Sequence, residues 1–275
     1  MKKILVPTDF STCAGSALKY ALGLAQKIEA EITVLHVIFP NDGINNNLYD
    51  AFWIDDYVTQ RNRDLKEWSS QIKADLGNPE VKVHYACSIG FPVGVIADTA
   101  SEMGATFVVM GTMGATGLKG ILLGSTAGGV IAQAKIPVFT VPAGATFGPK
   151  ADFVLATDFN MRTDKKSHKA LELVLQAHGA KLTLLHVLKE GENPQPDREQ
   201  AISSQLEGID HHFRYIHDND VPNAVDNFIE STNAGGLIAV AHNHSLLHQL
   251  FYRSVSRAMA GRVQVPMLSL HDAQK

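Results

Sequence analysis

The sequence predicts an α/β fold with two tandem doubly wound domains, each a five-stranded, mainly parallel sheet flanked by helices. Apolar runs of strand length alternate with segments of helical period, which is the pattern of βαβ units. Runs such as ILVP (4–7) are apolar at every position, as in strands that are buried on both faces. Four segments of the first half also recur in the same order in the second half.

The elements of the first half follow from their hydrophobic periods. The run KILVPT (3–8) has the length of a strand, and segment 16–28 repeats apolar residues at helical spacing. The residues on that helical face are Leu18, Leu22, Ala25 and Ile28. The remaining elements are a strand at 31–39, a helix from about 53 to 76, a strand at 81–87, a helix at 94–104, a strand at 106–111, a helix after Gly124 and a strand at 136–142.

The second half repeats this pattern. ILVPTDFS (4–11) corresponds to FVLATDFN (153–160), and ITVLHVIFP (32–40) corresponds to LTLLHVLKE (182–190). Later, TFVVMGTMG matches GLIAVAHNH, and IPVFTVP matches VPMLSLH. Chance similarity does not keep its order over four elements, so we interpret the chain as a duplicated domain. The Gly/Pro-bearing segment 142–152 separates domains predicted at 1–144 and 152–275.

Composition excludes several classes of protein. The chain has 275 residues, 45% of them hydrophobic, and a net charge of −4 without long blocks of one sign, so we expect neither a nucleic-acid surface nor a membrane surface. Cys13 and Cys87 share no metal-ligand spacing and are expected to be reduced thiols. Pro7, Thr8 and Asp9 interrupt the first apolar run too early for a secretory signal, which predicts a cytoplasmic protein.

A glycine-rich stretch follows the fourth predicted strand. Its spacing is Gly111-x2-Gly114-x9-Gly124-Ser125, and Gly124, Ser125 and Thr126 open the next helix. A helix start carries unpaired N–H groups and attracts anions, so the loop could hold a polyphosphate. The order Lys119-Gly120 differs from a Walker A loop, and the spacing differs from the dinucleotide fingerprint. The alternative is that these glycines only form turns and cap a helix.

Asp9 follows the first strand, at the carboxyl edge where the glycine loop is expected to lie. Its carboxylate could accept hydrogen bonds from a ribose or from an adenine amino group. The alternative is that Asp9 caps the following helix, although Ser11 or Thr12 could do so instead.

The order VPTDFS, LHVI, VVMGTMG, GSTAGGVI, IPVFTV resembles the universal stress protein family in its tandem two-domain form. Gly111, Gly114, Gly124 and Ser125 match that family's nucleotide signature without a gap. The resemblance implies an adenine nucleotide alpha hydrolase-like fold and bound ATP. The phosphate oxygens of ATP could in turn recruit Mg²⁺. Ala127 departs from the Thr or Ser often found there. The binding residues it implies are Pro7, Thr8 and Asp9 at the adenosine end, Val37 just after the second strand, Met110, Gly111, Met113 and Gly114 along the ribose and phosphates, and Gly124, Ser125 and Thr126 at the phosphates.

The second copy departs from this signature. Ala241, His244, Ser254 and Val255 stand where the first copy has Gly111, Gly114, Gly124 and Ser125. Side chains would collide with a nucleotide there, and lost donors would weaken its binding. Asp158 is kept, but we expect the second domain to be structural or to bind something else.

Histidines gather in two places in the second copy. His242, His244 and His248 form one group, and His211, His212 and His217 form another. Three neighbouring imidazoles suit zinc, but no closed ligand set is readable, and solvated or packed histidines are the favoured interpretation. His36 and His186, which recur at equivalent strand positions, are expected to be core residues that bond backbone groups.

These features favour an ATP-binding regulator or sensor in stress response, with ATP in the first domain. A slow ATPase and a scaffold or adaptor that binds no nucleotide remain as alternatives. No second acid, His or Lys is placed by motif beside the phosphate loop, which argues against dedicated catalysis. The final strands of the two domains are expected to pair within the chain like a fused homodimer, with further homodimerisation open and protein partners unknown.

Overall fold

The computed structural model describes residues 1–39, 51–77, 79–113, 123–150, 152–159, 162, 164–241 and 265–271. Within these residues the chain forms two compact units, the first ending at Phe147 and the second beginning at Gly148. This boundary falls inside the Gly/Pro-bearing segment 142–152. No helix in the described part of the chain is long and apolar enough to cross a membrane.

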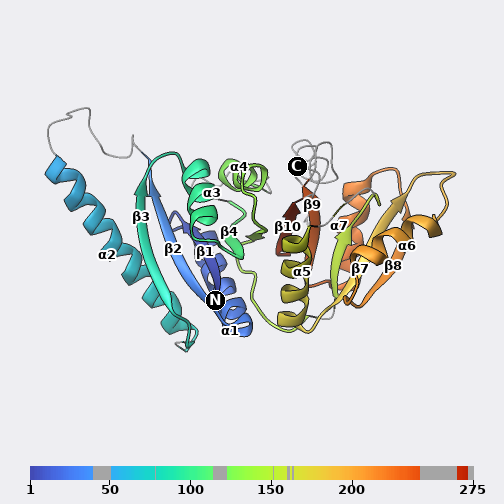
Figure 1. Ribbon diagram of the computed structural model, residues 1–275, viewed down its shortest axis with the longest axis horizontal. Helices are drawn as coiled ribbons and strands as arrows, with labels where there is room; N and C mark the ends of the chain where they lie inside the picture. The colour runs from blue at the N-terminus through green and yellow to red at the C-terminus, as the bar shows by residue number, and fades with distance from the viewer. Residues whose placement is uncertain are drawn as a thin grey trace. The chain divides into compact units, whose positions relative to one another are not determined.

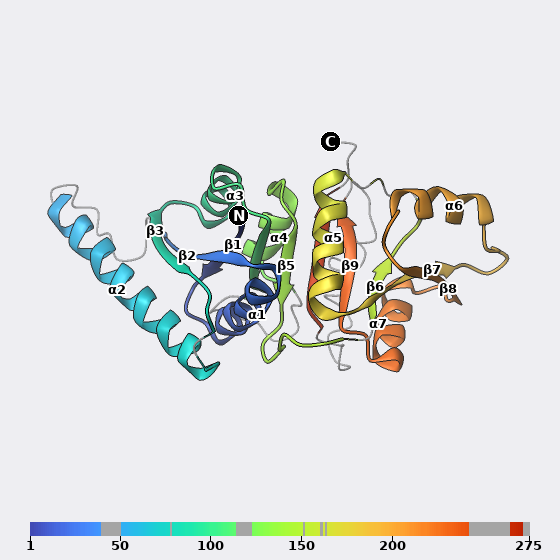
Figure 2. The same ribbon diagram turned by 60° about the horizontal axis from the view of Figure 1, so that its bottom comes forward.

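The first unit contains a parallel sheet with the strand order β3-β2-β1-β4-β5 (Figure 1). The helices α1 and α2 contact each other, and so do α3 and α4, so the sheet is covered on both faces (Figure 2). Its elements are β1 (Lys2–Thr8), α1 (Thr12–Ile28), β2 (Ala30–Ile38), α2 (Ala51–Asp75), β3 (Val83–Ile89), α3 (Pro92–Glu102), β4 (Phe107–Gly111), α4 (Ser125–Gln133) and β5 (Val138–Val141).

The second unit repeats this architecture with the parallel order β10-β9-β6-β7-β8. The helices α6 and α7 lie on opposite sides of strands β6 to β8 (Figure 2). Its elements are β6 (Asp152–Ala156), α5 (Lys165–His178), β7 (Lys181–Leu188), α6 (Pro196–Gln205), β8 (His211–His217), α7 (Val221–Thr232), β9 (Gly236–Ala241) and β10 (Met267–His271). The doubly wound α/β fold is confirmed.

The central strands of both units are buried on both faces, as their apolar sequences predict, whereas the edge strands β3 and β8 are half-buried or exposed. Ile4, Leu5 and Val6 in β1 and Phe153 and Val154 in β6 have no exposed surface. In α1, the whole predicted apolar face is buried, which confirms the assignment from helical period.

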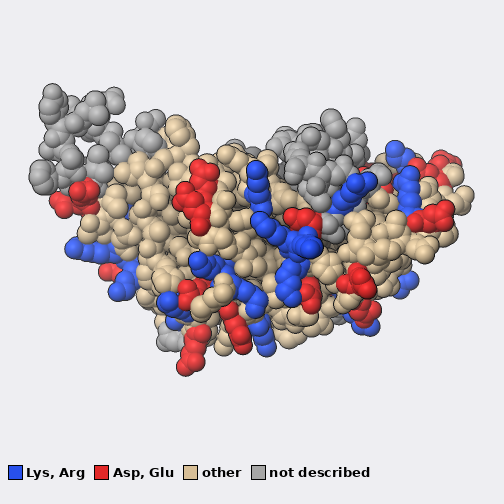
Figure 3. Space-filling model, in the orientation of Figure 1, with Lys and Arg blue, Asp and Glu red and all other residues tan. Residues whose placement is uncertain are grey.

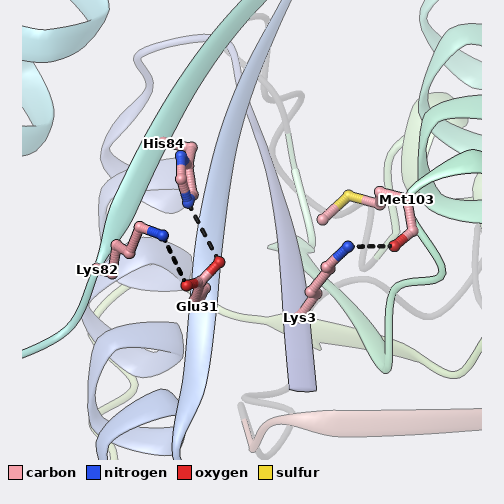
Figure 4. A network of polar contacts seen from close by, with 5 residues as sticks. All are labelled: Lys3, Glu31, Lys82, His84 and Met103. Atoms are coloured by element: carbon pink, nitrogen blue, oxygen red, sulfur yellow. Dashed lines mark hydrogen bonds and ion pairs between the residues drawn. The ribbon is translucent and has the colours of Figure 1, made fainter. Parts of the chain in front are cut away.

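The basic pair at the start of the chain stabilises two helix ends. Lys2 Nζ donates to the carbonyl of Ile28 at 2.8 Å, at the end of α1. Lys3 Nζ donates to the carbonyl of Met103 at 3.1 Å, at the end of α3 (Figure 4). Because neighbouring strand residues face opposite sides of the sheet, each lysine reaches the helix on its own side.

A second polar cluster lies at the amino edge of the same sheet, away from the carboxyl ends of the strands. Glu31, at the start of β2, accepts from Lys82 Nζ at 2.9 Å and faces His84 Nε2 at 3.2 Å (Figure 4). The hydrogen bond from Lys82 holds the pKa of Glu31 below its usual value. Acidic and basic side chains lie next to one another over much of the face in Figure 3, as the composition predicts.

The start of α6 differs from the sequence prediction. The polar run GENPQPDREQ (191–200) predicts a solvated loop before a shorter helix, but the helix already begins at Pro196. Proline is favoured in the first turn because its missing N–H is not needed there, and Asp197 and Glu199 complement the helix dipole. The Tyr215 hydroxyl donates to Glu199, which joins α6 to β8.

His178 ties the end of α5 to the segment that enters the second unit. Its Nδ1 donates to the carbonyl of Gly148 at 2.6 Å, and Lys150 N donates to the carbonyl of His178 at 3.1 Å. Burial lowers the pKa of His178 below its usual 6.5. The folded second unit therefore favours the neutral form of the His178 imidazole.

This lowered pKa predicts a pH dependence of stability. As the pH falls below 6.5, the unfolded chain takes up a proton on His178 before the folded chain does. The contribution of His178 to the free energy of unfolding is therefore full above pH 6.5 and falls as the pH drops toward the folded-state pKa. We expect His178→Gln to lose less stability than the unchanged chain between about pH 7.5 and about pH 5, because glutamine does not titrate. Urea unfolding followed by circular dichroism measures this difference, and identical pH dependence in the two proteins would contradict it.

Candidate functional site

The candidate site lies at the carboxyl edge of the first sheet. Strand β1 pairs with β2 on one side and with β4 on the other, so the direction of winding reverses beside β1. Ligands in open α/β sheets bind at such a switch point, outside the carboxyl ends of the strands. The ends of β1, β2 and β4 and the start of α4 meet this condition.

A tight turn ends β1 and presents Asp9. Thr8 Oγ1 accepts from Phe10 N at 3.0 Å, and Asp9 Oδ1 accepts from Ser11 N at 3.1 Å. Phe10 has a φ of 64°, a left-handed conformation that is strained for a bulky side chain. As a result, Asp9 is exposed at the edge while Thr8 stays buried.

His36 holds this turn from the neighbouring strand. Its Nδ1 donates to the carbonyl of Thr8 at 2.9 Å, so the expectation that this histidine bonds the backbone is confirmed. The Phe10 ring packs on the imidazole at 4.7 Å and on Trp68 at 5.6 Å between ring centroids. The hydrogen bond from His36 to Thr8 and the packing of the Phe10 ring on His36 and Trp68 together hold Phe10 in its strained conformation.

Ser11 caps α1, so Asp9 does not. Ser11 Oγ accepts from Ala14 N at 3.2 Å and is the N-cap of the helix. The alternative role for Asp9 is therefore wrong, and its exposed carboxylate lies at the edge where a ligand would arrive.

The second unit contains the same turn. Thr157 Oγ1 accepts from Phe159 N at 3.0 Å, and Phe159 has a φ of 63°. His186 Nδ1 donates to the carbonyl of Thr157 at 2.7 Å and packs against Phe159 at 4.6 Å. His186 bonds the backbone as expected, although His186 and His36 are half-buried rather than in the core, and the hydrogen bonds of the two turns match.

Gly111 ends β4 where the chain passes close to the start of α1. A Cβ on this glycine would lie 3.0 Å from both the backbone carbon and the Sγ of Cys13 and 3.2 Å from Ala14 N. Cys13 is buried and its thiol donates to the carbonyl of Val141 at 3.3 Å, so it is held in place. Glycine here lets β4 and α1 pack closely.

The end of β4 is bonded to the beginning of α4. Gly124 N donates to the carbonyl of Thr112 at 2.7 Å, and Thr112 N donates to the carbonyl of Val141 at 3.1 Å. Gly124 is the N-cap of α4 and provides no side-chain cap. Among the described residues, no side chain accepts from the first-turn N–H groups of Ser125 and Thr126, and Ser125 is exposed.

Three further candidate residues lie at or near the carboxyl ends of β1, β2 and β4. Val37 is expected just after the second strand but lies within β2, as the second-last residue, because the strand continues to Ile38. Met110 is buried, so only its backbone could face a ligand, and Pro7 is likewise buried.

Met113 and Thr126 are half-buried at the same edge, whereas Gly114 lies outside the described residues. Ala127 is buried, so its side chain packs in the core.

The second unit leaves most of its predicted differences outside the described residues, among them His242, His244, His248, Ser254 and Val255. His211 Nε2 lies 2.9 Å from Ser203 Oγ, and His212 Nε2 lies 3.0 Å from Thr183 Oγ1. Within the described part of the chain no group of three His, Cys, Asp or Glu residues could hold a metal ion.

Known proteins resemble the first unit in sequence. A family model described as Universal stress protein family matches residues 1–142. Universal stress protein MJ0531 of Methanocaldococcus jannaschii is 32% identical over 142 residues, which is 51% of this chain and 81% of that protein. Universal stress protein MJ0577 of the same organism is 30% identical over 154 residues, which is 51% of this chain and 94% of that protein.

One solved structure matches both units in fold. A universal stress protein from Archaeoglobus fulgidus aligns with 98% of this chain and 98% of its own, with a TM-score of 0.69 and 24% sequence identity. The α/β fold of the chain is therefore shared with a known protein.

The bond between His36 and Thr8 predicts a loss of stability on mutation. His36→Leu would remove the side-chain hydrogen bond to the carbonyl of buried Thr8 and the ring contact with Phe10, and we expect the first unit to lose about 1–3 kcal/mol of unfolding free energy. Both tryptophans of the chain lie in the first unit, so urea unfolding followed by tryptophan fluorescence reports on it.

The control is His84→Leu, because His84 is exposed on β3 of the same unit and contacts only the side chain of Glu31 among the bonds described, at the amino edge of the sheet and away from the turn. Exposed substitutions usually change stability by no more than about 0.5 kcal/mol. Equal unfolding midpoints for the two variants would show that the bond does not hold the turn.

Proposed function

Because the chain belongs to the universal stress protein family, we propose that its first unit binds ATP and that the protein acts as a nucleotide-dependent regulator in stress response. The observation that carries this proposal is the start of α4. Its N-cap residue, Gly124, provides no side-chain cap and is bonded to the end of β4, beside the switch point. Such a helix start is suited to phosphate oxygens.

In this proposal the nucleotide lies along the carboxyl edge of the first sheet. The triphosphate faces Gly124, Ser125 and Thr126, and Mg²⁺ arrives with its oxygens. The exposed carboxylate of Asp9 accepts from the ribose hydroxyls or from the adenine amino group. The other residues assigned to the ligand are Pro7, Thr8, Val37, Met110, Gly111, Met113 and Gly114.

The regulatory role follows from what phosphoryl transfer would need. A dedicated enzyme positions a base or a water-orienting group beside the terminal phosphate. His36 cannot serve through Nδ1 because that nitrogen is bonded to the carbonyl of Thr8. Slow hydrolysis of ATP remains the second candidate function. A regulator and a slow ATPase would hold the nucleotide in the same place.

For the second unit we propose that nucleotide is not held in this way. Val255 stands at the position of Ser125, and His244 at that of Gly114. The first unit is therefore the nucleotide-binding part of the chain.

A charge reversal at the helix start tests the phosphate site. An aspartate at the first position of α4 is favourable for the helix dipole, so Ser125→Asp should fold, but it places a negative charge against the triphosphate. We expect calorimetry with Mg-ATP to show affinity reduced by at least about tenfold, a loss of about 1.4 kcal/mol.

Asn223→Asp is the matched control, because it adds the same charge to the first turn of α7 in the second unit. It should bind Mg-ATP like the unchanged chain. Undiminished binding by Ser125→Asp, or no binding by the unchanged chain, would exclude the proposed site.

Turnover separates a regulator from an enzyme. We expect phosphate release from ATP at well under about one per second, the low end of enzymatic rates. A coupled phosphate assay measures it, with Asp9→Ala as the site variant and Asp158→Ala, its counterpart after β6, as the control. Release of several phosphates per second that only Asp9→Ala abolishes would establish an ATPase.

A further inference from the structure

The second unit contains a cavity of about 290 Å³ at the carboxyl ends of β6 and β7. It lies beside the turn at Thr157, Asp158 and Phe159, and all of its lining residues belong to the second unit. Both α6 and α7 contribute, one from each side of the sheet (Figure 2). A cavity of this size suits one small organic molecule.

The inner wall of the cavity is apolar. Strands β6 and β7 pair as far as Ala156 and Leu185, and Thr157 N donates to the carbonyl of Leu185. Past this bond β7 continues to Leu188, and its Val187 lines the cavity together with Val221 and Val225 of α7. These side chains can cover an apolar group but cannot pair with a polar one.

The outer rim carries charge of both signs. Lys189 follows β7 and Arg198 lies in the first turn of α6, and both are exposed. The ion pairs formed among the described residues involve neither of these two cations. By contrast, the carboxylate of Glu192 accepts from Lys189 N at 2.9 Å.

We propose that this cavity binds a small carboxylate with an apolar body. The carboxylate would pair with Arg198 and Lys189 at the rim, and guanidinium can bind it through two parallel hydrogen bonds. The apolar body would lie against Val187, Val221 and Val225. The site is independent of the nucleotide site proposed for the first unit.

The charges of the lining select a carboxylate over a phosphate. Two cations and two carboxylates, Lys189, Arg198, Asp158 and Glu192, line the cavity. These four charges cancel, so the lining attracts an anion only weakly, and the cost of removing the ligand from water, which grows with the square of its charge, favours a single negative charge over a doubly charged phosphate ester. The start of α7 is also capped, because Asp220 accepts from Asn223 N at 3.3 Å, which leaves it less suited to a phosphate.

The experiment titrates the full chain with 3-phenylpropionate by calorimetry. We expect saturable binding, and no comparable binding of the neutral 3-phenylpropionamide, which lacks the charge. Arg198→Gln should weaken the carboxylate by at least about tenfold, since the main cation is lost while glutamine keeps α6 helical. Val221→Phe should also abolish binding, by filling the cavity.

The matched control is Arg214→Gln, the same change at an exposed position on β8 that does not line the cavity. It should bind 3-phenylpropionate like the unchanged chain, and circular dichroism checks that every variant is folded.

AMP forms the phosphate arm of the test, measured as the binding that Ser125→Asp keeps and that Ser125→Asp combined with Val221→Phe loses, because Ser125→Asp weakens the first-unit site without removing it. Tighter binding of AMP than of the carboxylate would overturn the choice of ligand. No saturable carboxylate binding, or equal binding by Arg198→Gln and Arg214→Gln, would overturn the site itself.

Discussion

The geometry of both units depends on one hydrogen bond, from a histidine in the second strand to the threonine carbonyl at the end of the first. His36 bonds Thr8 in the first unit, and His186 bonds Thr157 in the second. The phenylalanine two residues after the threonine can then adopt a left-handed conformation, because its ring is held on the imidazole of the same histidine. The aspartate between them is thereby placed at the edge of the sheet.

The two units use the same turn beside different surroundings. In the first unit the turn lies next to the end of β4 at Gly111. The residue after it, Thr112, is bonded to Gly124, the N-cap of α4, which provides no side-chain cap. In the second unit the turn lies next to a cavity with an apolar inner wall and a charged rim, which is made by the β7–α6 connection and α6. Conservation of the turn within the chain and divergence around it are what a duplicated domain with two different ligands would show.

Much of the fold could be predicted because hydrophobic period reports directly on burial. The apolar face of α1, the buried strands and the backbone-bonded His36 and His186 all follow from it. The strained Phe10, the early start of α6 at Pro196 and the cavity in the second unit could not. They depend on ring packing, on a proline in a polar segment and on side chains far apart in the sequence, and none of these leaves a periodic pattern.

The proposed function requires that phosphates bind the first-turn N–H groups of α4. The most direct measurement is the amide resonance of Ser125 in a labelled full-length chain during titration with Mg-ATP and, separately, with adenosine. The account predicts a large shift of this resonance with Mg-ATP and little shift with adenosine, because only the former brings phosphate oxygens to the N–H group. An unchanged Ser125 resonance at saturating Mg-ATP would contradict it.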